Sequence, residues 1–389
     1  MASPRERLTE AESNRIYQEE IRPIQLGGLT ASTTPTLVLV GGPPGSGHTV
    51  LAPRLGAELA SRSGTPLVFA VDDLREHHPA WLGSGQPTIQ TTARVDADAA
   101  RWAERLLADA IAARKSVVLA TDFASVQALR AITTDFRAGG YRIEAAVLGV
   151  DAARSQRGVL GRALDAHQRR QRFALVPAAQ QRQAYLSLRA TVQAIELEQL
   201  VHSLRIVRRD GSATYSNRIV DDKWVREPTA TWTLDAERDR PKTPASKASN
   251  AVAWHQLTAR AQRAKDLPQS VIDQAVTWRK EASAEALADP TAAKQYQGKL
   301  AAAAFRTMPR ERFVREFPSF IGALERLDKA VEHAKAEYAI EENRTTFVAG
   351  VRERIAQQIE TGRQFTRLKS AEPAQKAGPA KSRDDPQTR

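Results

Sequence analysis

Cysteine is absent from the 389-residue sequence, which excludes disulfide bonds, thiolate metal sites and a cysteine nucleophile. The sequence also has no long apolar run, so no membrane-spanning helix is expected. Residues 1–7 lead into a polar stretch and lack the apolar core of a signal peptide. The seven histidines include no H-x-H or H-x-x-x-H pair of the kind that binds zinc, and no G-x-S-x-G nucleophile motif occurs. Together these absences favour a cytoplasmic location.

The composition is that of a globular protein, with 42% hydrophobic and 26% charged residues. A formal net charge of +12 favours an anionic partner, either a nucleic acid or a phosphorylated small molecule. The basic residues are mostly interleaved with acidic ones, as in 310–312, and no aromatic-basic platform is present. We therefore do not expect nucleic-acid binding, and interpret the charge as a solvated arginine-rich surface with room for a phosphate pocket.

Short, continuous apolar runs alternate with helical patterns over the first two hundred residues. Continuous runs are typical of parallel strands covered on both faces. Helices are expected at 101–114, where apolar residues recur at helical spacing, and at 126–138, which two glycines follow. This alternation predicts a doubly wound α/β domain. The expected strands are 36–42, 66–71, 116–120 and 143–150, with a weaker fifth at 204–208.

Composition divides the chain into four parts. The α/β domain is expected to span residues 1–226. Three prolines among charged residues and serines predict a linker or long surface loop at 227–250. A helical C-terminal region is expected over 251–367, and the tail at 368–389, rich in Pro, Lys, Ala and Asp, is expected to be disordered.

A phosphate-binding loop is predicted where the first strand ends. The pattern G-x-x-x-x-G-K-[ST] binds phosphate because its glycines let backbone N–H groups converge on phosphate oxygens, at the positive end of the following helix. The Ser or Thr hydroxyl then ligates magnesium. A glycine-rich turn without a ligand is the alternative. The predicted loop consists of Gly42, Pro43, Pro44, Gly45, Ser46, Gly47, His48 and Thr49, with Thr49 as the magnesium-binding residue.

His48 stands where the pattern has lysine. Lysine brings a permanent charge on a long stem, whereas histidine is shorter and mostly neutral at pH 7, with an ordinary pKa of roughly 6.5. A bound triphosphate would raise that pKa, and a protonated imidazolium and a loss of transition-state stabilisation both stay open. Nucleotide binding is expected to survive the exchange.

A carboxylate motif, Asp72-Asp-Leu-Arg75-Glu-His-His78-Pro79, follows the second strand. An aspartate at the carboxyl end of a parallel strand next to a phosphate loop faces the site crevice. Asp72 there is a candidate general base for a substrate hydroxyl. Alternatively, Asp72 and Asp73 only cap the next helix.

A phosphate loop followed by D-x-x-R-x-x-H-P resembles the zeta toxin family of P-loop kinases. The resemblance covers roughly residues 10–230 and continues in Gly140-Tyr141, Ser155–Gly158, Arg162 and Arg172-Phe173, with further likeness in Val207–Gly211 and Tyr215–Asn217. It implies a P-loop kinase-like parallel sheet covered by helices. It further implies transfer of phosphate from ATP or GTP, with Mg2+, to the 3′-hydroxyl of UDP-N-acetylglucosamine.

By the same resemblance, Asp72 is the catalytic base, and Arg162 and Arg172 hold the transferred phosphate. Arginines on a helix beside the loop can close over phosphates, although a solvated helix face is the alternative. The resemblance also implies a small helical antitoxin that blocks the nucleotide site. The C-terminal helices either dock such a partner or extend the core.

Two positions depart from the family pattern. One is His48; the other is Ala120-Thr121-Asp122, where the family usually has E-G-T. Asp122 is a possible substitute for the glutamate, from a position two residues along. These departures keep a second hypothesis open, in which the chain is a nucleotide-binding pseudokinase or a degenerate toxin that acts as a binding module.

Overall fold

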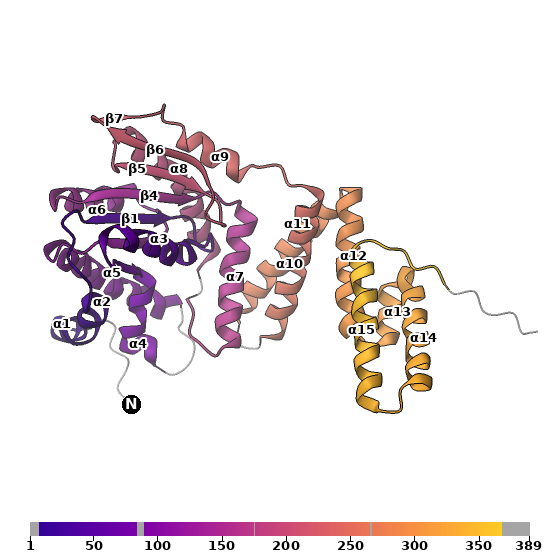
Figure 1. Cartoon of the computed structure of the whole chain (residues 1–389). Coiled ribbons are helices and arrows are strands. Elements are labelled where there is room, and N and C mark those ends of the chain that lie inside the picture. Colours follow the sequence, from indigo (N-terminus) through magenta and orange to yellow (C-terminus); the bar gives the residue numbers. More distant parts are fainter. Residues whose placement is uncertain (1–7, 84–88, 175, 265–266, 368–389) are drawn as a thin grey trace, which may run out of the picture. The chain divides into compact units, whose positions relative to one another are not determined.

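A computed structural model describes residues 8–83, 89–174, 176–264 and 267–367 (Figure 1). These residues belong to two compact units. The first comprises Met1–Lys242 and Ala253–Glu281, and the second comprises Thr243–Val252 and Ala282–Arg389. Among the described helices, none has the length and apolar character needed to cross a membrane.

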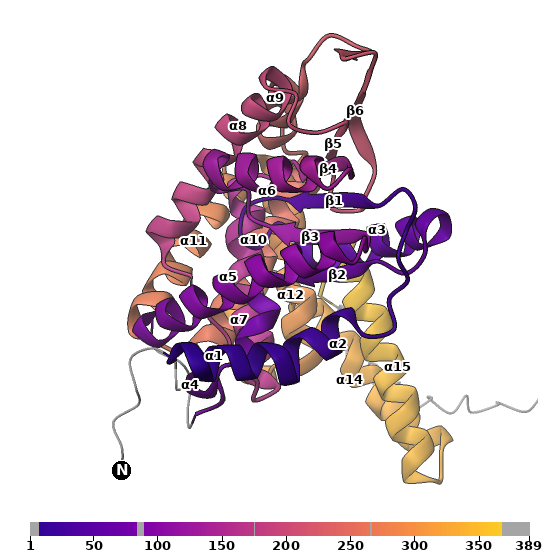
Figure 2. The ribbon, with the colours of Figure 1, turned by 90° about the vertical axis from the view of Figure 1, so that its left-hand side faces the viewer.

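The first unit is built on a seven-stranded sheet of order β2-β3-β1-β4-β5-β6-β7, which can be followed in Figures 1 and 2. The first five strands pair in parallel, and β6 and β7 add an antiparallel edge. The parallel α/β prediction and its five strands are thus confirmed. The strands are β1 (Thr36–Gly41), β2 (Leu67–Ala70), β3 (Val117–Thr121), β4 (Arg142–Leu148), β5 (Ser203–Val207), β6 (Ala213–Val220) and β7 (Lys223–Trp224).

Helices surround this sheet. The predicted helix at 126–138 is α6, with the same bounds, and the predicted 101–114 helix is the second half of the longer α5. Two helices that the first unit shares with the second are described below. The other helical elements of the first unit are α1 (Glu10–Ile16), η1 (Tyr17–Ile21), α2 (Arg22–Leu26), α3 (His48–Ser63), η2 (Val71–His77), α4 (Pro79–Leu82), α5 (Ile89–Ala112), α6 (Val126–Ala138), α7 (Ala152–Gln168), α8 (Ala178–Leu197) and α9 (Ala230–Arg238).

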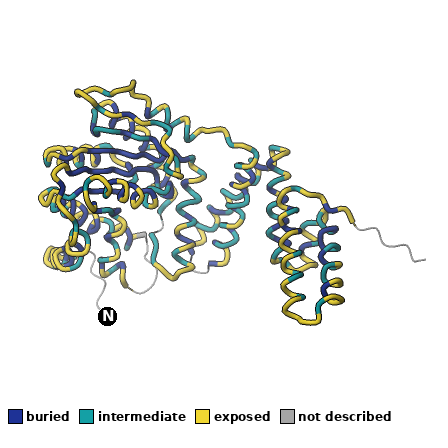
Figure 3. Tube along the Cα trace, in the orientation of Figure 1, coloured by how far each residue is buried: buried dark blue, intermediate teal, exposed yellow. Residues whose placement is uncertain are grey.

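The two faces of the sheet are both buried, which explains the continuous apolar runs. Alternate residues of a strand point to opposite faces, so Leu37 and Leu39 enter one core while Val38 and Val40 enter the other. The first core takes side chains from α1, η1, α5, α6, α8 and α9, and the second takes them from α3. In Figure 3 the central strands β1, β3 and β4 accordingly appear as buried segments.

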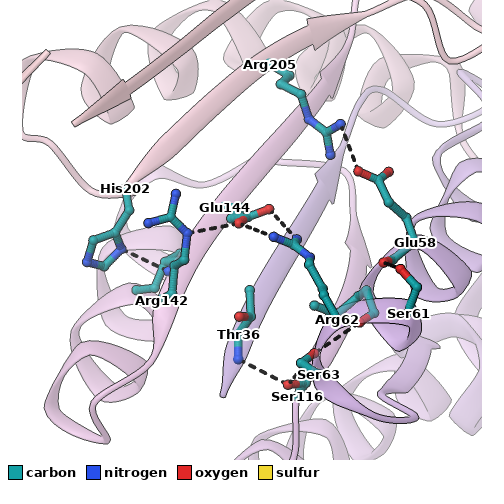
Figure 4. A network of polar contacts seen from close by, with 12 residues as sticks. Thr36, Glu58, Ser61, Arg62, Ser63, Ser116, Arg142, Glu144, His202 and Arg205 are labelled. Atoms are coloured by element: carbon teal, nitrogen blue, oxygen red, sulfur yellow. Dashed lines mark hydrogen bonds and ion pairs between the residues drawn. The ribbon is translucent and has the colours of Figure 1, made fainter. Parts of the chain in front are cut away.

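The amino ends of the strands are joined by a charged network, shown in Figure 4. Glu144 of β4 is 8% exposed and accepts two hydrogen bonds from Arg62 of α3, at 3.1 and 2.8 Å, and one from Arg142 at 3.0 Å. Burial alone would raise the pKa of Glu144, but the two arginines lower it overall. The network fixes the end of α3 against the sheet, opposite the end where α3 begins.

The predicted linker at 227–250 is corrected by the structure. Helix α9 occupies Ala230–Arg238, and its Ala230 and Leu234 are fully buried in the core of the first unit. The next helix, α10 (Pro244–Arg263), starts at a proline. Proline fits the first turn of a helix because it has no N–H to leave unpaired, so here it marks a helix start and not a loop.

The C-terminal part is helical, as predicted. In the helix Ile321–Glu337, Leu324, Leu327 and Ala334 are buried. The predicted disordered tail, 368–389, lies outside the described residues. The helices α10 and α11 (Gln269–Leu287) each contribute to both units, and the second unit continues with α12 (Pro290–Thr307), α13 (Arg310–Glu316), η3 (Pro318–Phe320), α14 (Ile321–Glu337) and α15 (Glu341–Glu360).

Candidate active site

The predicted phosphate loop connects the carboxyl end of β1 to α3. Gly45 and Gly47 have φ angles of +79° and +105°, which favour glycine, and Gly47 is the N-cap of α3. The N–H of Ser46 donates to the carbonyl of Pro43 at 2.9 Å, and the Ser46 side chain is fully buried. The loop therefore has the strand, glycine turn and helix start that a phosphate requires.

Helix α7 packs directly against this loop. Ser155 donates from Oγ to the carbonyl of Pro44 at 2.7 Å, and Gln181 of α8 donates to the same Oγ at 3.4 Å. The backbones of Gly45 and Gly158 touch, because a Cβ on Gly158 would lie 2.1 Å from the Gly45 carbonyl oxygen. The resemblance segment Ser155–Gly158 thus supports the loop from behind.

His48 is the first residue of α3 and is partly buried. Its Nδ1 is 3.1 Å from the Ser46 Oγ. Burial, and secondarily the positive charge of Arg162, lower the pKa of His48 to about 4. The charge of Asp72 and a hydrogen bond with the Gly42 backbone act in the opposite direction but are weaker. Without a ligand, the imidazole is therefore neutral at pH 7.

Asp72 lies just beyond β2, in η2, where the sequence places it. Its side chain is 57% exposed and forms an ion pair of 3.0 Å with Arg75. Arg75 is in turn held by Asp96 of α5 at 2.5 Å and lies over the ring of Trp81. Arg75 therefore orients Asp72 while leaving the carboxylate open to solvent. Asp73, in contrast, accepts the N–H of Ala70 at 2.8 Å and is the capping residue of the pair.

His78 and Pro79 complete the motif in structural roles. The Nδ1 of His78 accepts the N–H of Ala80 at 3.1 Å, so its Nε2 carries the proton and donates to Asp98 at 3.0 Å. His78 and Asp98 are 4% and 1% exposed. This buried pair ties the start of α4 to α5 and keeps η2 in place.

Asp122, which follows β3, lies near Asp72. Burial raises the pKa of Asp122, and the negative charge of Asp72 raises it further, whereas a hydrogen bond from the N–H of Ala124 lowers it.

Thr49, the predicted magnesium-binding residue, is the second residue of α3. Among the residues described, no three His, Asp or Glu side chains form a metal-binding group. Mg2+ in kinases commonly uses few protein ligands together with substrate phosphates, a role that Thr49 and Asp122 fit.

The two predicted arginines differ in their surroundings. Arg162 of α7 interacts electrostatically with His48, Asp72 and Arg75, so it belongs to the same cluster. Its side chain is accessible but crowded by protein, and this partial desolvation lowers the pKa of Arg162. Arg172 lies in the segment after α7 and donates to the backbone carbonyl of Gly83 at the end of α4. The structure thus brings Arg162 to the loop and engages Arg172 elsewhere.

Sequence reasoning missed other arginines around the loop. Arg209, in the turn between β5 and β6, lies over Gly47, since a Cβ there would be 3.2 Å from the Arg209 Nε. Burial lowers the pKa of Arg209, and the charges of Arg154 and Arg162 lower it further. Burial likewise lowers the pKa of Arg157, next to Arg154 and Arg209. Arg209 falls within Val207–Gly211, a segment of the family resemblance, but nothing in that segment indicates phosphate binding.

The fold and the loop together define a P-loop kinase-like protein: a parallel sheet with a phosphate loop after β1, a carboxylate after β2 and arginines over the loop. The zeta toxin family model matches residues 25–219, half of the chain, and the chain belongs to the zeta toxin family. The zeta toxin family consists of nucleotide-binding kinases. A search of curated proteins found no match.

Solved structures agree with this fold. A structure from the PezAT chromosomal toxin–antitoxin system of the human pathogen Streptococcus pneumoniae is 16% identical, with a TM-score of 0.54, over 67% of this chain and 100% of that chain. AvrRxo1-ORF1:AvrRxo1-ORF2 structures with sulphate ions and with ATP are 15% and 14% identical, over 71% of this chain and 87% of theirs, with TM-scores of 0.42 and 0.39. The first of these likenesses shows the fold.

Proposed function

We propose that the chain transfers the γ-phosphate of ATP or GTP to a hydroxyl of a sugar nucleotide, UDP-N-acetylglucosamine. The observation that carries this proposal is the placement of Asp72, which is exposed, held by Arg75 at 3.0 Å and electrostatically linked to Arg162 and His48 beside the phosphate loop. Family membership supports the choice of sugar nucleotide.

Each step uses a residue of this cluster. Backbone N–H groups at the start of α3 bind the phosphates, and Thr49 holds the Mg2+ that accompanies them. Asp72 accepts the proton of the substrate hydroxyl while the oxygen of that hydroxyl bonds to the γ-phosphorus. The bond between the γ-phosphorus and the bridging oxygen breaks, and the nucleoside diphosphate leaves. Arg162 balances charge on the transferred group, and we propose that Arg172 joins it from the segment after α7.

The test is phosphotransfer to UDP-N-acetylglucosamine by Asp72→Asn and by Asp73→Asn as matched control. Loss of a general base lowers the rate by about 10²–10⁴-fold, so Asp72→Asn is expected to lose transfer while nucleotide binding persists. Asp73→Asn keeps its rate within a few-fold because Asp73 caps backbone. Equal transfer by the two variants, or no transfer to any UDP-sugar by the wild type, would refute the proposal.

The second candidate is a pseudokinase, a protein that binds nucleotide without transferring phosphate. The neutral His48 and the alanine at 120 favour it, since both replace charged groups of the family pattern. Radiolabelled nucleotide separates the two candidates. Stable binding with no labelled product in an overnight reaction supports the pseudokinase, and labelled product supports the kinase.

We further propose a cytoplasmic location and a small helical antitoxin that covers the nucleotide site. Family membership supports both, and the PezAT structure is of a toxin–antitoxin system. Co-expression with a small helical antitoxin, followed by gel filtration and nucleotide titration, tests the partner. A complex that still binds nucleotide with the affinity of the free chain would contradict a partner at this site.

A further inference from the structure

The phosphate loop of this chain lacks a positive charge at the position where kinases of this kind have lysine. His48 does not replace it: histidine has a shorter side chain than lysine and no permanent charge, and its Nδ1 lies 3.1 Å from the Ser46 Oγ within the loop. A triphosphate carries several negative charges, and its binding is strongest where fixed cations face it. A substitute cation must be permanently charged and must reach the glycine side of the loop.

Arg209 meets both conditions. Its guanidinium lies over Gly47, the residue before His48: a Cβ on Gly47 would be 3.2 Å from Nε and 3.9 Å from Nη2. Arginine stays charged at all physiological pH values, even though burial lowers the pKa of Arg209. Within the described part of the chain, no hydrogen bond or ion pair engages its side chain, whereas the adjacent Arg208 pairs with Glu237 at 3.0 Å.

The turn that carries Arg209 is fixed on both sides. Arg54 of α3 donates to the carbonyl of Asp210 at 2.9 Å, and Asp210 accepts two hydrogen bonds from Ser212, at 2.9 and 2.6 Å. The pair of Arg208 with Glu237 anchors the other side to α9. The backbone thus holds the Arg209 side chain at the loop without using its guanidinium, which is the arrangement of a preorganised ligand contact.

The surroundings of Arg209 are also positive. The charges of Arg154 and Arg162 lower its pKa further, and the charge of Arg209 acts on Arg157. The Nε of Arg157 is buried without a hydrogen-bond partner among the described residues. Besides Asp210, whose carboxylate accepts from Ser212, carboxylates in this region include Asp151, 3.9 Å from Arg154, and Asp72, which acts on Arg162. Like charges held together without enough carboxylates favour an anion between them.

We propose that Arg209 contacts the β- and γ-phosphates and supplies the positive charge that lysine supplies in the usual loop. The phosphate-binding cation of this chain thus lies in the turn between β5 and β6 and not at the start of α3. The proposal rests on the nucleotide binding proposed above and names the side chain that makes it possible without lysine.

A double-mutant cycle tests whether Arg209 supplies the charge of the missing lysine. Nucleotide affinity is measured by calorimetry on the full chain. Loss of a hydrogen-bonded charge contact weakens binding by about 10- to 100-fold, which is expected for Arg209→Ala. Arg209→Lys keeps the charge and is expected to lie between wild type and Arg209→Ala. Arg218→Ala is the matched control, because Arg218 is an exposed arginine on the neighbouring β6. It is expected to change affinity by less than about threefold.

The decisive variant is His48→Lys. Alone it is expected to change affinity by only a few-fold, but in Arg209→Ala it is expected to restore most of the lost affinity, because the two cations serve the same phosphates. Thermal melting confirms that each variant is folded. Additive effects of the two substitutions, or Arg209→Ala and Arg209→Lys binding as the wild type does, would overturn the role of Arg209 and leave the proposed function intact. A wild type that binds no nucleotide would overturn both.

Discussion

Replacing His48 with glutamine, and following nucleotide affinity across pH, distinguishes a neutral imidazole from a charged one at the phosphate loop. The pKa of His48 is lowered to about 4. At pH 7 it therefore lies about 3 pH units below the solution pH, and protonating the ring costs about 4 kcal/mol at 1.36 kcal/mol per unit. Arg162 and Arg209 are charged already, so a triphosphate gains their interaction without that cost.

We therefore expect His48 to stay neutral when nucleotide is bound. The nucleotide titrates by itself near neutral pH, so the useful quantity is the ratio of the Kd of His48→Gln to the Kd of the wild type. This ratio removes the contribution of the ligand. Measured by calorimetry from pH 6 to pH 8, it is expected to stay constant within about twofold.

The opposite result has a clear signature. If nucleotide binding raised the pKa of His48 above neutrality, the bound state would take up a proton on the ring. Wild-type affinity relative to His48→Gln would then increase as the pH falls, by up to about tenfold per pH unit. Such a slope would refute the neutral imidazole, and with it the argument that the arginines carry the charge of the site.

Two further predictions concern the framework of the site. Gly158→Ala places a Cβ 2.1 Å from the Gly45 carbonyl oxygen, so it is expected to displace the loop and weaken nucleotide binding at least about tenfold. Gly161→Ala is the control, because its Cβ meets nothing within 4 Å, and it is expected to keep the wild-type affinity. Equal nucleotide affinities of the two variants would contradict the contact. Glu144→Gln is expected to lower the free energy of unfolding by about 1–3 kcal/mol at pH 7 in urea denaturation. Because the pKa of Glu144 is lowered in the folded state, this contribution is present above the unfolded pKa and is lost as the pH falls through the folded value, so the variant and wild type should converge in acid. Unequal stability at pH 7 that persists unchanged at pH 3 would show that the carboxylate charge is not its source.

The sheet was predictable because burial on both faces leaves a strong local signal. Residues 37–40 are apolar without alternation, and their neighbours on both sides of the sheet are fully covered. Helix α9 was not predictable in the same way. Pro228, Pro241 and Pro244 flank it among charged residues, as in a loop, and the packing of Ala230 and Leu234 against the sheet buries its apolar side. That packing depends on contacts distant in sequence.

The same difference between local signals and contacts distant in sequence applies to the candidate site. The loop and the Asp72 motif are contiguous in sequence, so their spacing alone indicated a phosphate site, and the roles of Asp72 and Arg162 in catalysis remain predictions. Arg209 is more than 150 residues from Gly47 in the chain, and nothing in its own neighbourhood points to phosphate. Its place follows from the parallel order β1-β4-β5, which brings the end of β5 to the same edge as the loop.

The contact between Gly45 and Gly158 limits how this protein can open and close. The two backbones pack without intervening side chains, and Ser155 also bonds to the Pro44 carbonyl, so we expect the first turns of α7 to stay with the loop. Arg162 lies one turn beyond Gly158, and we expect any bend of α7 that moves Arg162 to occur after that contact. Gly161 has open space around it and is the weakest helix former at that point. A change in the position of Arg162 would therefore require a bend in the middle of α7, with its first turns held at the loop.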